Sequence, residues 1–165
     1  MEDRKIRIAI THGDTNGIGY EMIFKTFAEP EMLELCTPII YGSPKVAAYH
    51  RNVLDLQVNF TIINNAEEAC ERRLNLLTVF EDDMKVDIGR PTEESGEAAV
   101  KALEKAIDDC QNGHVDAIVG APVCDSNFKV GKTMYGEQTY FLEKKLGGNA
   151  KALRMIVGKK MRMAF

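Results

Sequence analysis

Residues 10–21, ITHGDTNGIGYE, contain residue types that could hold an anion. They follow a short apolar run, and Gly13, Gly17 and Gly19 leave backbone N–H groups accessible to a phosphate at a strand-to-helix turn. The glycine spacing matches neither G-x-G-x-x-G nor G-x-x-x-x-G-K-[ST], which excludes the two common nucleotide-binding motifs. Two interpretations stay open: glycines that contact a ligand, and glycines that only allow tight packing. We predict that this loop lines a ligand cleft and that Gly17 or Gly19 has a positive φ.

Two side chains of this loop could take part in acid–base chemistry. His12 stands beside Asp14 at the expected carboxyl end of a strand, where a carboxylate can orient a neutral imidazole. The alternative for His12 is a structural hydrogen bond, and the alternative for Asp14 is to cap the following helix. His50 is expected at an exposed or boundary position, and His114 is expected to help close a helix. The three histidines have no ligand spacing, so we expect no metal site in this chain.

The elements that position the loop alternate between strand and helix. Apolar, β-branched runs predict strands at residues 6–11, 37–42, 58–63, 74–79 and 114–119. Helical spacing predicts helices at residues 18–27, 44–54, 66–71 and 95–112, the second capped by Ser43 and the last by Ser95. Residues 81–94 are predicted to be a loop with at most one short edge strand. This order predicts an α/β layered sheet with helices on both faces, formed by residues 1–165 as a single unit.

The carboxyl-terminal residues predict two further strands, at 153–157 and 161–165, around the turn Gly158-Lys159-Lys160. Met161, Met163 and Phe165 alternate with Arg162 and Ala164, as the inward face of a strand would. Because the sequence stops within this alternation, we expect the chain to be part of a longer polypeptide.

Composition narrows the functional classes. With 45% hydrophobic residues among 165, the chain can bury a substantial core. Its 21 Lys and Arg residues against 25 Asp and Glu give a net charge of −4 without a basic stripe, so we expect no nucleic-acid partner. No apolar run reaches about 18 residues, and the amino terminus lacks the form of a secretory signal. We therefore expect no membrane contact and a cytoplasmic location.

The pattern T-x-G-[DE]-x-x-G-I-G-x-E in residues 11–21 resembles the opening of the 4-hydroxythreonine-4-phosphate dehydrogenases, the PdxA family. Residues 38–48 are similar to the second strand and following helix of that family, and residues 95–119 to its long helix and next strand. Ala121-Pro122 matches the A-P or G-P that follows. The resemblance covers the whole chain but only the front half of the family's length.

The resemblance implies an isopropylmalate-dehydrogenase-like fold, a homodimer and an NAD-dependent oxidation of a secondary alcohol on a small phosphorylated substrate. A divalent metal would assist the decarboxylation that follows. The three metal-binding histidines of the family lie beyond its equivalent of Phe165, so we expect neither catalytic nor metal-binding residues in this chain. NAD and metal belong to the complete family member, and we expect this chain alone to bind neither tightly and to be inactive.

The family's substrate motif G-H-T-E aligns with residues 137–140, EQTY, so Thr139 is retained while Gln138 replaces a histidine and Tyr140 a glutamate. Asp125 stands where the family has a lysine. We expect Gln138 and Thr139 to point into the cleft from the start of a helix that runs to about residue 146. Lys129 and Lys132 could replace the missing lysine, although a solvated loop is the favoured interpretation.

These departures leave two other hypotheses open. One is a catalytically inert relative used for binding or assembly, which the three replaced residues of the motif region suggest. The other is a generic phosphate-binding α/β domain, which rests on the glycine-rich loop alone.

Overall fold

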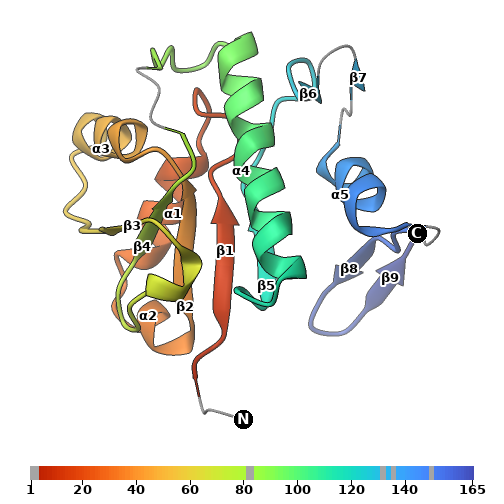
Figure 1. Ribbon diagram of the computed structural model, residues 1–165, viewed down its shortest axis with the longest axis horizontal. Helices are drawn as coiled ribbons and strands as arrows, with labels where there is room; N and C mark the ends of the chain where they lie inside the picture. The colour runs from red at the N-terminus through yellow and green to blue at the C-terminus, as the bar shows by residue number, and fades with distance from the viewer. Residues whose placement is uncertain (1–3, 81–83, 131–132, 135–136, 149–150) are drawn as a thin grey trace.

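The computed structural model describes residues 4–80, 84–130, 133–134, 137–148 and 151–165. Five parallel strands form a sheet in the order β3-β4-β2-β1-β5 (Figure 1). The strands are β1 (Arg7–Thr11), β2 (Thr37–Gly42), β3 (Thr61–Ile63), β4 (Asn75–Thr78) and β5 (Ala117–Gly120). Because all five are parallel, their carboxyl ends meet at one edge of the sheet.

Helices cover both faces of the sheet, as the sequence predicts. On one face α1 (Gly19–Phe27), α2 (Met32–Leu35) and α3 (Pro44–Val53) pack over Ile10 and Ile40. On the other face α4 (Glu93–Gln111) and the short 3-10 helix η1 (Ala66–Glu68) pack over Ala9 and Ile39. Adjacent residues of one strand thus enter opposite cores, which is the pattern of a buried parallel sheet.

The starts of α3 and α4 show how local sequence sets the helix boundaries. Ser43 caps α3 as predicted, since its Oγ accepts a hydrogen bond from the Val46 amide at 3.4 Å. For α4 the predicted cap is wrong: Thr92 is the cap, and Ser95 lies three residues inside the helix. Thr92 Oγ1 accepts from the Ser95 amide at 3.1 Å while Ser95 Oγ accepts from the Thr92 amide at 3.2 Å. This reciprocal capping box starts the helix at Glu93.

Several boundaries differ from the sequence-based expectation. β3 starts at Thr61 rather than at residue 58, and the helix predicted at residues 66–71 is one turn of 3-10 helix. β5 starts only at Ala117, because the amides of His114 and Val115 still donate to the Asp109 carbonyl of α4. The α2 helix has no counterpart among the predicted elements. Residues 84–92 contain no strand, and residues 81–83 lie outside the described residues.

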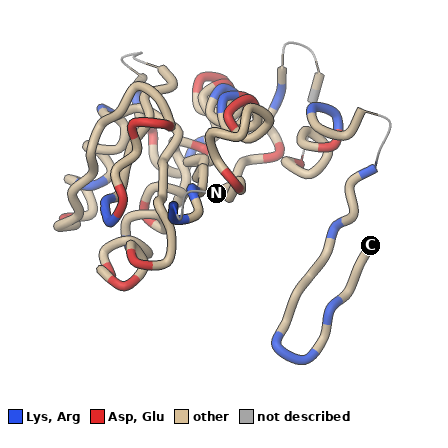
Figure 2. Tube along the Cα trace, turned by 60° about the horizontal axis from the view of Figure 1, so that its bottom comes forward, with Lys and Arg blue, Asp and Glu red and all other residues tan. Residues whose placement is uncertain are grey.

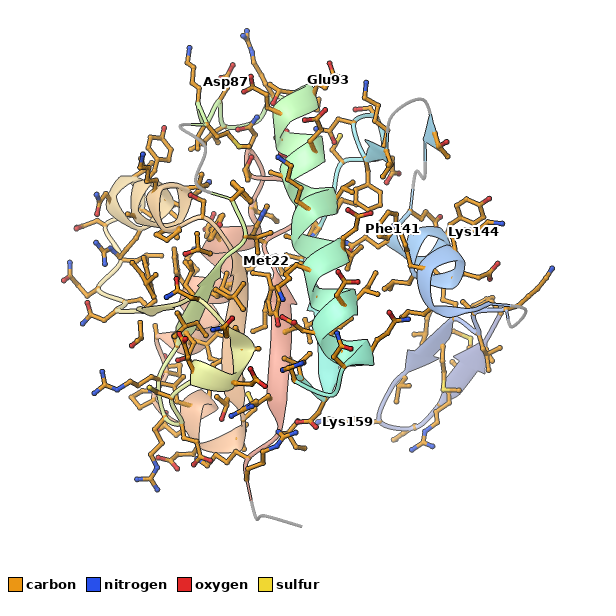
Figure 3. All side chains as sticks on the ribbon, in the orientation of Figure 1. Met22, Asp87, Glu93, Phe141, Lys144 and Lys159 are labelled. Carbon is orange, nitrogen blue, oxygen red and sulfur yellow. The ribbon has the colours of Figure 1, made fainter. Side chains whose placement is uncertain are left out.

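After β5 the chain forms the antiparallel pair β6 (Lys129–Val130) and β7 (Thr133–Met134), helix α5 (Gln138–Leu146), and the antiparallel hairpin of β8 (Met155–Val157) and β9 (Arg162–Ala164). Helix α5 ends at Leu146 as predicted, and the hairpin is present, although β8 starts two residues later than predicted and β9 is one residue shorter at each end. Phe141 of α5 is buried against Phe128 and the side of α4 (Figure 3). The hairpin lies away from the five-stranded sheet in both views (Figures 1 and 2).

The expectation that one face of the last strand points inward is wrong for the described structure. Met161, Met163 and Phe165 are all exposed, because no other described element covers the hairpin. Among the described helices, none is long and apolar enough to cross a membrane.

Candidate functional site

The order of the strands creates a crevice between β1 and β5. The chain leaves β1 toward α1 on one face of the sheet, whereas it leaves β5 toward α5, which packs beside α4 on the other face. Two neighbouring parallel strands whose following loops diverge in this way leave a space beyond their carboxyl ends, where α/β proteins bind ligands.

A cavity of about 250 Å³ occupies this place. Three segments that are distant in the sequence line it: the loop after β1, the residues before α4 and the residues after β5. The lining residues are Asp14, Asn16, Gly17, Ile18, Gly89, Arg90, Pro91, Pro122, Val123 and Cys124. The glycine-rich loop was predicted to line a cleft, and four of its residues do line this cavity. The sequence reasoning missed Arg90 and Cys124, although the position of Cys124 just after a predicted strand was a usable signal.

The turn after β1 depends on Gly13 and Gly19. Gly13 has φ +71°, and a Cβ there would collide with the Pro122 carbonyl oxygen. A Cβ on Gly19 would collide with the His12 carbonyl oxygen. The prediction of a positive φ at Gly17 or Gly19 is wrong, because the chain reverses immediately after β1, at Gly13. This reversal lets the Asp14 amide donate to the Pro122 carbonyl at 3.0 Å and so joins the loops after β1 and β5.

Asp14 has neither of its predicted partners. Its carboxylate accepts the Asn16 amide at 2.8 Å and the Asn127 side-chain amide at 3.0 Å. Within the described residues, α1 has no side-chain cap, and its N-cap residue is Ile18. The turn at Gly13 directs the carboxylate of Asp14 toward the start of α4 instead. Asp14 therefore stabilises the shape of the loop.

Asn127 links this loop to the start of α4. Its side-chain nitrogen lies 3.0 Å from Asp14 Oδ2, 2.7 Å from the Thr92 carbonyl and 2.9 Å from Ser95 Oγ. The close approach needs Gly96, where a Cβ would collide with the Asn127 carbonyl oxygen. A buried network of this kind fixes the relative position of the segments that it joins.

Asn16 holds the third wall of the cavity. Its side-chain amide donates to the Arg90 carbonyl at 2.8 Å, and its Oδ1 accepts from the Asp87 amide at 2.8 Å. The Asn16 carbonyl also accepts from the Gly89 amide at 2.8 Å. Figure 3 shows Asp87 and Glu93 at the same end of the molecule, beyond the carboxyl ends of the strands. The backbone of residues 87–90 is thus tied directly to the glycine-rich loop.

His12 lies in the core rather than in the cavity wall. Its ring is fully buried, stacks on Tyr20 at 5.3 Å between centroids and meets the ring of Phe80 edge-on at 5.7 Å. Among the described residues, neither ring nitrogen has a hydrogen-bond partner. Burial lowers the pKa of His12 to about 4, so the ring is neutral at pH 7. The predicted pairing with Asp14 and the alternative structural hydrogen bond are both wrong.

The other two histidines, His50 and His114, make hydrogen bonds that stabilise the fold. His50 is buried rather than exposed or at a boundary, and its Nε2 donates to the Thr15 carbonyl at 2.7 Å. The His114 amide donates to the Asp109 carbonyl and so closes the end of α4, as expected. Among the described residues, no group of three or more His, Cys, Asp or Glu side chains could hold a metal ion.

The residues just before α1 and the Arg90 side chain are the groups of the cavity that suit an anion. Gly17 and Ile18 line the cavity immediately before the helix, at the positive end of the helix dipole. The Gly17 amide itself donates to the Asp14 carbonyl at 3.0 Å. The Arg90 guanidinium is largely exposed and lies 3.6 Å from an Asp87 carboxylate oxygen. This end of the crevice can therefore accept one negatively charged group.

Gln138 and Thr139 lie in the first turn of α5 and are half-buried. The Gln138 side-chain amide donates to the Ala121 carbonyl at 2.8 Å and packs against Gly120, where a Cβ would collide with it. Among the described residues, neither Gln138 nor Thr139 lines the cavity of about 250 Å³. Their predicted role in substrate binding stays a prediction.

The structure also shows the position of Asp125, which replaces the family's lysine, and of Lys129, which could supply the missing positive charge. Asp125 is exposed, and Lys129 pairs with Glu93 at 2.7 Å. Lys132 lies outside the described residues. The ammonium group of Lys129 is therefore held at the start of α4.

Comparison with known proteins identifies relatives of about twice the length. The family model described as pyridoxal phosphate biosynthetic protein PdxA matches residues 34–165. The chain is 48% identical to the 4-hydroxythreonine-4-phosphate dehydrogenase of Bacteroides thetaiotaomicron, over 99% of this chain and 45% of that protein. It is 33% identical to the enzyme of the same name from Aquifex aeolicus, over 90% of this chain and 45% of that protein.

Solved structures of the same description have the same fold. The 4-hydroxythreonine-4-phosphate dehydrogenase of Burkholderia phymatum superposes with a TM-score of 0.83 at 24% identity, over 98% of this chain and 49% of that one. The Klebsiella pneumoniae protein superposes with a TM-score of 0.84 at 19% identity, over 99% and 50%. The chain thus spans about half the length of the relatives it matches. On the family match and the 132 residues it spans, from 34 to 165, the chain belongs to the PdxA family.

Proposed function

We propose that this chain forms the amino-terminal part of a PdxA-type oxidoreductase in pyridoxal phosphate biosynthesis. The complete enzyme would oxidise the secondary alcohol of 4-hydroxythreonine 4-phosphate, or of a related phosphorylated hydroxy acid, with NAD. The observation that carries the proposal is the cavity between β1 and β5, because it lies where the strand order of an α/β sheet predicts a ligand. The same proposal includes a homodimer and a cytoplasmic location.

The cavity suits part of a dinucleotide. The positive end of the α1 dipole, next to Gly17 and Ile18, and the Arg90 guanidinium suit a phosphate group. NAD, when bound, accepts a hydride from the substrate alcohol. The residues of this chain would bind and orient it: Asn16 and Asn127 hold the walls in place, and Gly17 allows close approach of the ligand to the backbone.

A divalent metal does not fit the described residues, which offer no suitable group of ligands. Its ligands in the proposed enzyme would come from elsewhere in the complete protein.

The proposed contribution to substrate binding comes from the start of α5. Thr139 could donate its hydroxyl to a substrate oxygen. Gln138 can form neutral hydrogen bonds, but it cannot supply the charge-assisted bond that a protonated histidine gives to an anion. We therefore expect weaker binding of a phosphorylated substrate. Asp125 adds to this effect, because it places a negative charge where the family has a lysine.

A second candidate function is that of a catalytically inert relative which retains the fold for binding or assembly. The specific observation in its favour is that the Gln138 amide is already bonded to the Ala121 carbonyl. A side chain amide held in this way is less available to a substrate than an unbonded amide would be.

The test uses two proteins: this chain, and a chimera that continues it after Phe165 with the carboxyl-terminal portion of the Bacteroides thetaiotaomicron relative. We expect NADH formation from 4-hydroxythreonine 4-phosphate by the chimera, dependent on a divalent metal, and none by this chain alone. A chimera that is folded and binds NAD but forms no NADH would favour the inert relative. Metal-dependent NADH formation by this chain alone would contradict the proposed division of the enzyme.

A further inference from the structure

Another hollow lies at the carboxyl ends of the strands, near the edge of the sheet opposite β5. The chain leaves β2 for α3 on one face of the sheet, whereas after β4 it continues to α4 on the other face. Neighbouring parallel strands whose connections diverge in this way leave space for a ligand beyond their carboxyl ends. A cavity of about 360 Å³ occupies this place, lined by Ser43, Pro44, Lys45, Ile62, Asn64 and Thr78.

This cavity, which we call the α3 slot, is separate from the crevice between β1 and β5. Among the described residues, the two share no lining residue. In the order of the sheet the slot lies at β3, β4 and β2, whereas the crevice lies at β1 and β5. The slot is therefore a candidate site that the proposed enzymatic function does not use.

Two walls of the slot are apolar. Ile63 packs into the core on the α4 side, so its neighbour Ile62 points toward the face of the sheet on which α3 lies. Helix α3 leaves this side chain uncovered, since Ile62 is 56% exposed. Pro44, the first residue of α3, lines the slot from the helix. Apolar contacts from the sheet and from the helix suit a flat ring.

Three polar side chains of the slot have hydrogen bonds still to make. Ser43 is 1% exposed, and its Oγ accepts from the Val46 amide at 3.4 Å, but among the described residues its own hydroxyl proton has no acceptor. In the same part of the chain, the Thr78 hydroxyl and the Asn64 carboxamide have no hydrogen-bond partner. A buried donor without an acceptor destabilises a protein unless water or a ligand supplies the acceptor.

The charges around the slot favour a neutral ligand. The Glu68 carboxylate accepts from the Asn64 amide at 3.0 Å and from the Asn65 side chain at 3.0 Å, so a negative charge is held next to Asn64. A phosphate or carboxylate ligand would be repelled by this charge. A cation fits no better, because none of the residues that line the slot in the described structure is acidic.

We propose that the α3 slot binds a neutral planar heterocycle that carries hydrogen-bond acceptors along one edge, as a nucleobase does. The ring contacts Pro44 and Ile62, and its edge accepts from the hydroxyls of Ser43 and Thr78 and from the Asn64 carboxamide. The oxygen of the same carboxamide can accept from a ring N–H or amino group, which gives the site a preference among bases. This inference goes beyond the proposed function and does not depend on it.

The test follows the backbone amide NMR signals of this chain during titration with adenosine, guanosine, cytidine and uridine, and with ribose as the control. We expect at least one nucleoside to shift the signals of residues 43–45, 62–64 and 78 with a dissociation constant of about 1 mM or lower. We expect ribose to shift none of them. The proposal would be overturned if no nucleoside shifts these signals, if ribose shifts them equally, or if the shifts are confined to residues 14–18 and 89–90 of the crevice.

Matched variants locate the contact. Asn64→Ala and Thr78→Val remove donors from the slot, and we expect each to weaken binding of the nucleoside about tenfold or more. The controls are Asn59→Ala and Thr61→Val, since Asn59 precedes β3, Thr61 begins it and neither lines the slot. We expect both controls to bind like the unmodified chain, and circular dichroism checks that all four variants are folded. Unchanged binding in both test variants, or equal losses in the controls, would contradict the assignment.

The monophosphate of the bound nucleoside tests the argument from charge. We expect it to bind about threefold or more weakly than the nucleoside, because Glu68 repels it. Tighter binding of the monophosphate would make the slot an anion site and overturn the proposal. NADH formation by the chimera is measured separately: nucleoside binding at the slot without NADH formation supports this inference and counts against the proposed function, and NADH formation without binding at the slot does the reverse.

Discussion

Acidification should destabilise the fold through His12. Its ring is fully buried and neither nitrogen has a hydrogen-bond partner among the described residues. Protonation would therefore place a charge in the core that the Gly13 backbone and the Asp14 charge offset only in part. Burial lowers the folded-state pKa of His12 to about 4 from an ordinary value of 6.5. Because the folded-state value is the lower one, the unfolded chain binds more protons between these two pH values. The free energy of unfolding therefore carries no loss from His12 well above pH 6.5, and it falls as the pH decreases toward 4.

The size of the loss follows from the same two values. At about 1.4 kcal/mol per pH unit, the full difference corresponds to roughly 3 kcal/mol, reached below pH 4. Between pH 7 and pH 5 the expected loss is about 2 kcal/mol, because most of the titration lies in this interval. This is a large part of the stability of an ordinary domain.

The assay is urea unfolding followed by circular dichroism at pH 7 and pH 5, for the unmodified chain and for His12→Leu. Each variant is compared with itself at the two pH values, so the packing cost of the substitution cancels. Burial also lowers the pKa of His50. The His12→Leu variant should therefore still lose some stability between pH 7 and pH 5, but less than the unmodified chain. Equal losses in both proteins would refute the assignment to His12, as would an unmodified chain whose free energy of unfolding is the same at both pH values.

Three further predictions concern the crevice and the start of α5. Gly13→Ala should lower the free energy of unfolding by about 2 kcal/mol or more, because the new Cβ would collide with the Pro122 carbonyl. The control is Gly113→Ala, which has a similar φ but open space around it and should lower the free energy of unfolding by only about 1 kcal/mol. Equal losses in urea unfolding would contradict the role of the Pro122 carbonyl. Asn127→Ala should cost about 3 kcal/mol and speed hydrogen exchange in the glycine-rich loop, and an unchanged exchange rate would contradict the network. In the chimera, Gln138→His combined with Asp125→Lys should tighten binding of the phosphorylated substrate about tenfold or more by calorimetric titration, and unchanged or weaker binding would favour the inert relative.

The sequence predicted those features that depend on residues near one another in the chain. The start of α3 follows from Ser43 and Pro44, and the last hairpin follows from two apolar runs around Gly158. The layered sheet follows from the alternation of strand and helix, because each helix must return the chain to the next parallel strand. In each case the interactions that decide the structure lie within a few residues.

The features that the sequence did not predict depend on distant contacts. Asp14 was interpreted through its neighbours, whereas its carboxylate bonds to Asn127, 113 residues away. His12 was expected at a cleft because it follows a strand, but the position of Phe80 and the helix carrying Tyr20 enclose its ring. Arg90 lies in a charged loop without a motif and reaches the cavity only because Asn16 holds the backbone there.

The two ends of the proposed site are held by separate contacts, and this separation has a functional consequence. The wall at the start of α1 is fixed by Asn16 and Asn127, whose described partners include no residue of α5. The other end depends on α5, where the Gln138 side chain donates to the carbonyl of Ala121, the residue after β5. A change at Gln138 can therefore alter substrate binding while the crevice beside α1 keeps its shape. If the proposed function is right, the departures at Gln138 and Asp125 should affect binding of the phosphorylated substrate much more than binding of NAD, so the two affinities should be measured separately in the chimera.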